Sequence, residues 1–210
     1  SDDKTLDVIN KYKNKIDLVI SEKDKGIFDA INKGIQRSSG DIISIIHSDD
    51  SFYDDKVLET VNKNFIEKDN LECLIGITLI KRKNSDFIVR KYNSSFFKKW
   101  MIYAGFTPPH PSTFIKKKVY DKIGFYKTDY DIAGDFDFFV RMFLKNKIIY
   151  KTINQNLVIM SMGGKSTKSI KSNLISNKEI LRSFKQNNIY SNFLFILLRF
   201  PIKLIQFILK

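Results

Sequence analysis

The stretch Gly40-Asp41-Ile42-Ile43-Ser44-Ile45-Ile46-His47-Ser48-Asp49-Asp50-Ser51 decides the fold. Its run of four isoleucines is typical of a short strand that is buried on both faces. Two adjacent carboxylates, Asp49 and Asp50, follow this run. Because an unpaired carboxylate is costly to bury, we expect the pair where the strand emerges into a crevice. In open α/β sheets, ligands bind beyond the carboxyl ends of the strands.

Asp49 and Asp50 predict a site for a divalent cation. Carboxylate oxygens suit hard cations such as Mg²⁺ or Mn²⁺, and such a cation in turn suits a diphosphate. The alternative is that the two residues only begin a loop or cap the next helix. Taken by themselves, these residues leave both interpretations open.

The composition allows one substantial domain, or a domain with an appendage. The chain has 210 residues, of which 43% are apolar and 13% are aromatic, enough for a packed core. Its formal charge of +13 would fit nucleic acid, an anionic membrane or phosphorylated substrates. Between Arg141 and Lys210 the only acidic residue is Glu179, so the positive charge belongs to the C-terminal third.

Cysteine and histidine are too few for two common kinds of metal site. The single Cys73 excludes an internal disulfide and a site built from cysteines. With only His47 and His110, a histidine-rich zinc site is not expected. No apolar run reaches the length of a bilayer-spanning helix.

Alternating helix and strand patterns predict an α/β fold with a parallel sheet and crossover helices. Helices are expected near 6–12, over 27–37 and over 54–67, with strands over 16–20 and 42–46. Two β-rich runs, 71–80 and 87–92, are separated by a polar turn and predict a hairpin.

Prolines and glycines then divide the middle of the chain. Three prolines within 108–111 predict a stiff loop that leads into a short strand at 114–116. A brief helix is expected to end at Gly124, and another to start near Asp135. The helical spacing of the following apolar residues points Asp135 away from them. Its plainest role would be a helix N-terminal carboxylate stabilised by the macrodipole.

Four segments, in this order, resemble motifs of the family 2 glycosyltransferases. Glu22–Gly34 resembles "E-x-D-x-G-I-Y-D-A-M-N-K-G", and Gly40–Asp50 resembles the "G-D-(I/Y)…(N/D)-S-D-D" strand and metal motif. His110–Phe114 resembles "H-Q-(A/S)-(T/F)-F", and Ala133–Phe138 is similar to "A-(A/E)-D-Y-D-(L/F)". The resemblance as a whole extends over about residues 1–165. Bacterial enzymes that build surface polysaccharides, including the colanic-acid type, carry similar motifs.

The resemblance implies a GT-A fold, an α/β architecture with a mixed, mainly parallel sheet flanked by helices. It also implies inverting, single-displacement transfer of a sugar from a nucleotide-diphosphate sugar to a saccharide acceptor, which we expect to be lipid-linked. A cofactor Mn²⁺ or Mg²⁺, bound by Asp49 and Asp50, would act as Lewis acid on the leaving diphosphate. Asp135 matches the position of the general base that takes the acceptor proton.

Further site residues follow from the same resemblance. His110 matches the acceptor side, although a loop histidine bonded to backbone is an equal alternative. His47 departs from the family, which has Asp or Asn there, and this shifts the metal role to Asp49 and Asp50. The residues that match donor-binding positions are Asp24, Asp29, Asn32, Lys33 and Asp49.

The resemblance also predicts how the chain is divided. Ser1–Thr5 looks like the end of a loop that follows the family's first strands and helix, so the GT-A domain over 1–165 is expected to lack its N-terminal strands. Residues 166–210 are expected to form a basic, amphipathic helical tail. Arg199, Pro201 and Lys203 interrupt its apolar runs, which favours a helix lying in an anionic leaflet over one that packs on the domain or on a second subunit.

The prediction is therefore a cytoplasmic glycosyltransferase, peripheral on the inner face of the cytoplasmic membrane. The main alternative is a non-catalytic, membrane-associated scaffold that keeps the fold. Binding to nucleic acid is not expected, because the excess charge lies beside an apolar tail rather than in a groove with aromatic stacking partners. The sequence does not identify the donor sugar, its base, the acceptor, the linkage or the oligomeric state.

Overall fold

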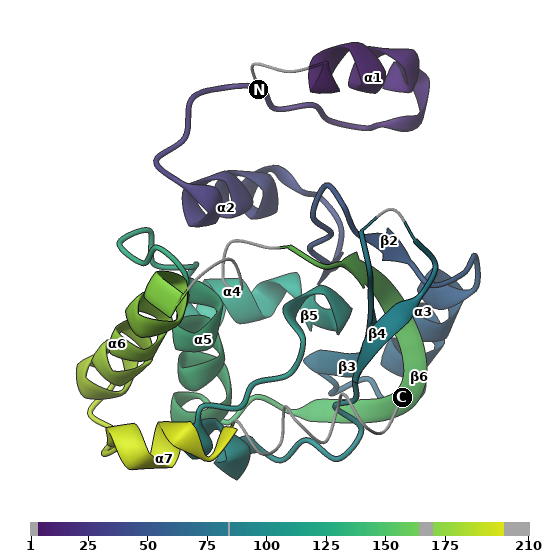
Figure 1. Ribbon diagram of the computed structural model, residues 1–210. Coiled ribbons are helices and arrows are strands. Elements are labelled where there is room, and N and C mark those ends of the chain that lie inside the picture. Colours follow the sequence, from purple (N-terminus) through teal and green to yellow (C-terminus); the bar gives the residue numbers. More distant parts are fainter. Residues whose placement is uncertain (1–3, 84, 164–169, 200–210) are drawn as a thin grey trace.

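A curled, mixed sheet lies at the centre of the computed structural model, which describes residues 4–83, 85–163 and 170–199 (Figure 1). Five of its strands form one row, and β4 (Ile88–Tyr92) pairs with β3 outside that row. The row runs β1 (Ile42–Ile43), β5 (Thr113–Lys116), β3 (Cys73–Lys81), β6 (Tyr150–Ser161) and β2 (Ser51–Phe52).

Only one pair of strands in the described part of the chain is parallel. This is β3 with β6, and it is the longest ladder, running from Cys73 opposite Tyr150 to Lys81 opposite Ser161. The four other pairs are antiparallel. The predicted mixed α/β fold is thus confirmed, whereas the expectation of a mainly parallel sheet is wrong for these residues. Short connections such as the β3–β4 hairpin can return the chain only in the antiparallel sense.

The central strand β3 separates two apolar cores. Its successive side chains point to opposite faces of the sheet, so Cys73 and Ile75 enter the larger core while Leu74 enters the smaller one. The smaller core lies under α3 (Val57–Glu67). Helices therefore cover both faces of the sheet.

The larger core is covered by several helices. Phe28 and Ile35 enter it from α2, and Ile180 and Phe184 enter it from α6. The α-helices that contribute to it are α2 (Ile27–Arg37), α4 (Lys117–Ile123), α5 (Gly134–Phe139), α6 (Ile170–Gln186) and α7 (Phe193–Leu197). In contrast, α1 (Thr5–Lys11) buries no residue and stands away from the sheet (Figure 1).

The isoleucine run does not form the central strand that its composition predicts. Only Ile42 and Ile43 pair, and they lie at the end of the row with β5 as their neighbour. Ile43 is buried, whereas Ile42 is only partly buried. An edge position offers ladder hydrogen bonds on one side only. The expected strand over 16–20 is also wrong, since Leu18 and Val19 are exposed and the segment is irregular.

Elements defined by local signals appear where the sequence predicts them. The helix over 27–37 has the predicted bounds, and the hairpin of β3 and β4 is formed. The helix α4 ends at Gly124, whose φ of 82° lies in the left-handed region that favours glycine. The helix at Asp135 begins one residue earlier, at Gly134. Beyond Phe139 it continues as a π-helix over Val140–Lys145.

The described residues that follow β6 are mostly helical. α6 packs against α5, and α7 adds Ile196 to the larger core. The second apolar run of the tail, at 202–209, lies outside the described residues, and the division of the chain at residue 165 stays a prediction. Among the described residues, none of the helices combines the length and the hydropathy needed to cross a membrane.

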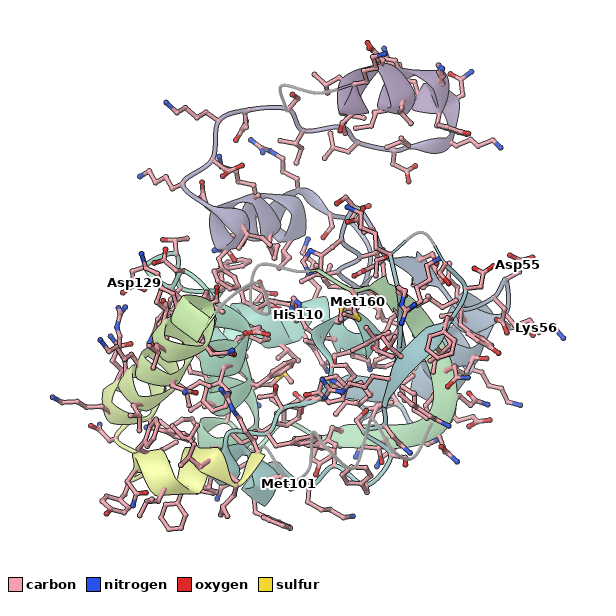
Figure 2. All side chains as sticks on the ribbon, in the orientation of Figure 1. Asp55, Lys56, Met101, His110, Asp129 and Met160 are labelled. Atoms are coloured by element: carbon pink, nitrogen blue, oxygen red, sulfur yellow. The ribbon has the colours of Figure 1, made fainter. Side chains whose placement is uncertain are left out.

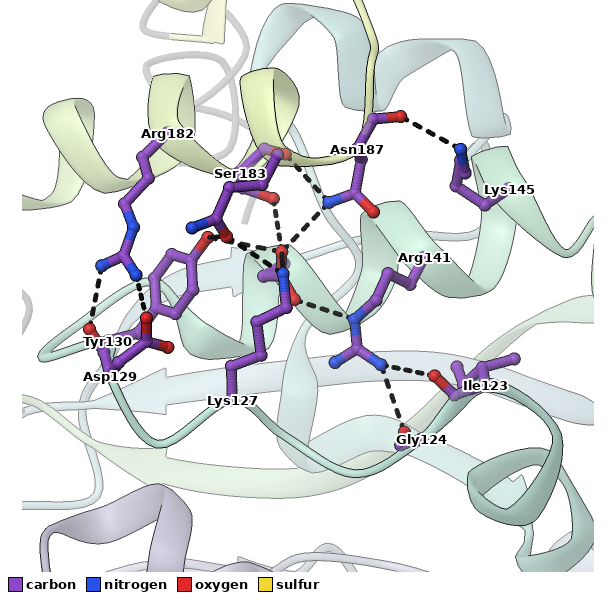
Figure 3. Close-up of polar contacts among 12 residues, drawn as sticks. Ile123, Gly124, Lys127, Asp129, Tyr130, Arg141, Lys145, Arg182, Ser183 and Asn187 are labelled. Carbon is purple, nitrogen blue, oxygen red and sulfur yellow. Dashed lines mark hydrogen bonds and ion pairs between the residues drawn. The ribbon is translucent and has the colours of Figure 1, made fainter.

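A buried carboxylate joins α5 to α6 (Figure 3). Asp137 is fully buried. Burial by itself would raise the pKa of this carboxyl, but the hydrogen bond and charge of Arg141, together with Lys127, hold it below its ordinary value. The side chains that donate hydrogen bonds to Asp137 are Arg141 (2.8 Å), Ser183 (3.0 Å), Asn187 (3.1 Å), Lys127 (3.2 Å) and Tyr130 (3.4 Å).

We expect Asp137→Ala to lower the free energy of unfolding by about 3–5 kcal/mol, because Arg141 would lose its buried partner. Urea unfolding at neutral pH measures this loss. The matched control is Asp129→Ala, which breaks an exposed pair with Arg182 and should cost less than about 1 kcal/mol. Equal losses in the two variants would contradict a special role for Asp137.

The contribution of Asp137 should also depend on pH. Its pKa is lower in the folded state than in the unfolded state, so its stabilisation is complete above the unfolded value of about 4. It is lost as the pH falls through the folded value. The difference in stability between the wild type and Asp137→Ala should therefore shrink in acid.

Candidate functional site

The acidic pair lies in a tight turn between β1 and β2. The backbone N–H of Asp50 donates to the carbonyl of His47 (3.0 Å), which closes the turn. The hydroxyl of Ser161 donates to the carbonyl of Asp49 (3.1 Å) and ties the turn to the end of β6. Asp49 is exposed, and Asp50 is partly buried.

Asp50 has an unused oxygen. Its Oδ2 atom is buried and accepts no hydrogen bond from the residues that the structure describes. Burial raises the pKa of this carboxyl, although the nearby His47 acts in the opposite direction. A buried oxygen without a partner is costly, and a cation is one group that would satisfy it.

The described residues do not form a complete metal site of their own. They include no group of three or more His, Cys, Asp or Glu side chains that could hold an ion. Mg²⁺ is commonly bound by one or two carboxylates together with phosphate oxygens of a substrate. Asp49 and Asp50 therefore fit a cation whose remaining ligands come from a bound diphosphate.

Tyr126 connects α2 with the proline-rich loop. Asn32 on α2 accepts from the Tyr126 N–H (3.0 Å) and donates to the Tyr126 carbonyl (2.8 Å). The Tyr126 hydroxyl shares a hydrogen bond with Nε2 of His110 (2.8 Å). The His110 ring lies 6.1 Å from the ring of His47, centroid to centroid. The structure thus links Asn32 and His110, from two predicted subsites, to the turn that carries Asp50.

His110, in the middle of the molecule in Figure 2, carries no charge at neutral pH. Burial, with the charge of His47, lowers the pKa of His110 to about 3. Burial also raises the pKa of its partner Tyr126. The pair is therefore a neutral hydrogen bond that orients both rings. The side chain of His110 is bonded to another side chain here, and its role on the acceptor side stays a prediction.

Two of the predicted donor residues bond to the turn that leads into α2, Asp24 from within the turn and Asp29 from the first turn of the helix. Asp24 accepts from the Gly26 N–H (2.8 Å), and Asp29 accepts from the Lys25 N–H (2.9 Å). Gly26 has a φ of 126°, which a side chain would disfavour. These bonds are local and lie at the surface.

Lys33 belongs to the same surface cluster. Its ammonium pairs with Glu22 (3.0 Å) and Asp29 (3.3 Å). Its hydrogen bond to Glu22 raises its pKa. Exposed pairs of this kind contribute little to stability. The donor-binding roles of Asp24, Asp29, Asn32, Lys33 and Asp49 stay predictions.

Asp135 lies in the first turn of α5 and lines a pocket of about 160 Å³. Its surroundings are mostly protein, and the pocket leaves part of the side chain open to solvent. Burial raises the pKa of Asp135 to about 6, although the Phe136 N–H donates to it (2.7 Å). The residues lining the pocket are Tyr92, Gly105, Thr107, Ile132, Ala133, Asp135, Phe136, Ser176, Ile180 and Arg199.

Glu179 holds the loop that leads into Asp135. Its carboxylate accepts from the backbone N–H groups of three successive residues, Asp131 (2.7 Å), Ile132 (2.9 Å) and Ala133 (2.7 Å). Its charge also contributes to the raised pKa of Asp135. Glu179 was not among the residues predicted for this site. One signal was present, since Glu179 is the only carboxylate between 141 and 210.

Two further residues of the pocket carry no signal in the sequence. The hydroxyl of Tyr92, on β4, donates to the carbonyl of Thr107 (2.7 Å). Arg199 is 5% exposed, and its Nη2 donates to Oδ1 of Asn177 on α6 (2.5 Å). Tyr92 lies more than forty residues from Asp135 and Arg199 more than sixty, so only the fold brings them together.

Comparison with known proteins identifies a family. A family model described as "Glycosyl transferase family 2" matches residues 1–143. The PGL/p-HBAD biosynthesis glycosyltransferase of Mycobacterium tuberculosis strain H37Ra is 24% identical over 188 residues, which are 87% of this chain and 68% of that protein. An uncharacterized glycosyltransferase of M. tuberculosis strain H37Rv is 30% identical over 121 residues, 58% of this chain and 45% of that protein.

Two solved structures have a similar fold. Residues 1–349 of TarS from S. aureus, in complex with UDP-GlcNAc, match with a TM-score of 0.64 and 18% identity over 88% of this chain. The mannosyltransferase PcManGT from Pyrobaculum calidifontis, in complex with GDP-Man and Mn²⁺, matches with a TM-score of 0.60 and 13% identity over 89% of this chain. The chain spans about half of the length of each, 55% and 52%. These likenesses support a GT-A type fold.

We expect Glu179→Gln to lower the pKa of Asp135, because it removes a neighbouring negative charge. It should also cost about 1–3 kcal/mol of unfolding free energy, since one amide of the loop loses its acceptor. Carboxyl NMR titration and urea unfolding measure the two effects. Glu59→Gln, an exposed change on α3, is the control. An unchanged pKa of Asp135 in Glu179→Gln would rule out the electrostatic link.

Proposed function

The chain belongs to glycosyl transferase family 2, and from this premise we propose an inverting, metal-assisted sugar transfer. The donor would be a nucleotide-diphosphate sugar and the acceptor a hydroxyl of a saccharide in bacterial surface polysaccharide synthesis. One observation carries the proposal. Asp135, at the position of the family's general base, lies in a pocket and has a pKa of about 6.

A pKa of about 6 suits a general base. At neutral pH most of the Asp135 carboxyl is ionised, yet it is more basic than an ordinary aspartate and binds a proton more readily. The Asp135 carboxylate would take the proton of the acceptor hydroxyl. The acceptor oxygen would then form a bond to the anomeric carbon, while the bond from that carbon to the diphosphate breaks on the opposite face. Inversion at the anomeric carbon follows from this geometry.

The leaving diphosphate requires charge neutralisation. A Mg²⁺ or Mn²⁺ ion held by Asp49 and Asp50 would supply it as a Lewis acid. The buried, unpartnered Oδ2 atom of Asp50 supports this assignment. The complexes of two proteins with similar folds, one with UDP-GlcNAc and one with GDP-Man and Mn²⁺, support uridine and guanosine diphosphate sugars as the first donors to test.

Neighbouring side chains would position the donor and the acceptor. Asn32 and His110 are held by Tyr126, which fixes the two on either side of one tyrosine. We assign Asn32, with Asp24, Asp29 and Lys33, to the donor side. The neutral imidazole of His110 would shape the acceptor side without adding charge.

A second candidate function is a non-catalytic scaffold with the same fold. It is favoured by the surface cluster at the start of α2, where Asp29 and Lys33 are already paired with each other and with their neighbours. Such pairing would have to open for either residue to contact a donor. Direct binding of nucleotide distinguishes the two functions.

We expect UDP or GDP to bind in the presence of Mn²⁺, with at least about tenfold weaker binding in Asp50→Asn and in Asp49→Asn because each loses a charged ligand to the cation. Isothermal calorimetry measures the affinity. The control is Asp55→Asn, since Asp55 is exposed and lies at the right-hand edge of the molecule in Figure 2. This variant should bind nucleotide as the wild type does. Absence of nucleotide binding in the wild type would favour the scaffold.

We expect Asp135→Asn to reduce the transfer rate by about 10²–10⁴ while nucleotide affinity is unchanged, because the change removes only the base. The wild-type rate should rise with pH through about 6 as Asp135 ionises. A donor-consumption assay measures both. Asp131→Asn, an exposed change in the same loop, is the control. Full activity of Asp135→Asn would refute the assignment.

A further inference from the structure

Two segments far apart in the sequence form one apolar face. The 3-10 helix η2 (Lys99–Ala104) packs against α7, and Figure 2 places Met101 of η2 beside α7. A Cβ atom on Gly105 would lie 3.3 Å from the side chain of Ile196, so the two segments are in close contact. The ring of Tyr103 also stacks on that of Phe184, on α6.

The side chains on the outside of these segments are large, apolar and exposed. We call this surface the η2–α7 face and define it by Trp100, Tyr103, Tyr190, Leu194 and Leu198. Their exposed fractions are 64%, 44%, 81%, 74% and 54%. A shallow apolar pocket of about 350 Å³, lined in part by Tyr190, opens in the same region. Clustered exposure of this kind marks an interaction site, whereas single exposed apolar residues are ordinary.

We propose that the η2–α7 face docks the protein on an anionic bilayer. Lys98 and Lys99 are exposed and directly precede Trp100 in the chain, and the exposed Lys185 lines the apolar pocket together with Tyr190. Residues 88–120 and 180–199 contain no Asp or Glu, so no carboxylate within these segments offsets the lysines. An apolar surface with a cationic rim complements acyl chains and anionic headgroups together. Trp and Tyr are the residues that favour the membrane interface.

A second copy of this chain suits the face less well. A two-fold interface brings the same patch of two subunits together. Here it would place two lysine-rimmed surfaces against each other, with no carboxylate from either segment to pair with them. Like charges brought together in this way oppose association. The positive charge around the face therefore favours an anionic bilayer over a second copy of the chain.

This surface extends the sequence-based prediction of a membrane-binding tail. That prediction rested partly on the apolar run 202–209, which lies outside the described residues. The face adds η2, about ninety residues earlier in the chain, and it includes the only tryptophan of the protein. Binding would thus depend on the folded domain as well as on its C-terminal segment.

The face adjoins the pocket of Asp135. Gly105 follows η2 and Arg199 follows α7, and both line that pocket. In the docked protein the pocket of Asp135 would therefore lie close to the bilayer surface. If the proposed sugar transfer is correct, a lipid-linked saccharide would meet Asp135 there; this last step rests on the proposed function.

Vesicle flotation of the full chain tests the docking. We expect the protein to float with vesicles that contain phosphatidylglycerol and to remain unbound with phosphatidylcholine alone. Trp100 is the only tryptophan, so its emission should shift to shorter wavelength on binding and be quenched by brominated lipid. Leu194→Asp should reduce the bound fraction several-fold. The matched control is Ile66→Asp, equally exposed at 71% but on α3, which should float as the wild type does.

Several outcomes would overturn the proposal. One is that Leu194→Asp and Ile66→Asp float equally, and another is that Trp100 emission stays unchanged while the vesicles carry the protein. Light scattering that shows a dimer in the wild type and a monomer in Leu194→Asp would assign the face to a second copy. Thermal unfolding by circular dichroism checks that both variants are folded. Because the assay needs neither donor nor acceptor, Asp135→Asn should float normally, which separates docking from sugar transfer.

Discussion

Two carboxylates, one on α5 and one on α6, join these two helices and the loop that precedes α5. Asp137 extends from α5 and accepts hydrogen bonds from Ser183 and Asn187, which lie on α6 and just beyond its end. Glu179 extends from α6 and accepts three backbone amides of the loop before α5. Burying a carboxylate is costly unless it is fully hydrogen-bonded. Each of the two carboxylates therefore holds the groups that donate to it in one position. Asp135 lies in the chain between Ala133, which bonds to Glu179, and Asp137, so its backbone is held on both sides.

Local patterns in the sequence predict the parts of the fold that local physics decides. The bounds of α2, the hairpin of β3 and β4, and the end of α4 at Gly124 all follow from apolar spacing and turn residues. The isoleucine run shows where this reasoning stops. Its composition indicates a buried strand, but how much of Ile42–Ile46 joins a ladder depends on neighbouring strands. In the described structure only β5 pairs with it.

The site divides in the same way. Asp50, His110 and Asp135 were predicted from motifs. In the structure Asp50 carries a buried oxygen without a hydrogen bond from the described residues, His110 is bonded to Tyr126, and Asp135 lines a pocket. Tyr126 and Arg199 were not identified, because each acquires its position through contacts with distant segments. A tyrosine that links a helix to a distant loop leaves no periodic pattern in a sequence. Glu179 is the exception, since a single carboxylate in an otherwise basic segment is a signal that the sequence alone provides.

The walls of the Asp135 pocket differ in how closely they are packed into the larger core. The wall that carries Asp135 is continuous with the largest core, where almost any change of volume would be felt. The wall at Arg199 belongs to α7 and the residues just after it, where Ile196 is the one described residue that enters that core. Arg199 is itself buried and bonded to Asn177, so its replacement would be costly, whereas the exposed Leu198 beside it can change with little cost to the fold. Diversification among relatives should therefore concentrate on such exposed positions at the edge of the pocket, while the buried residues behind them are retained.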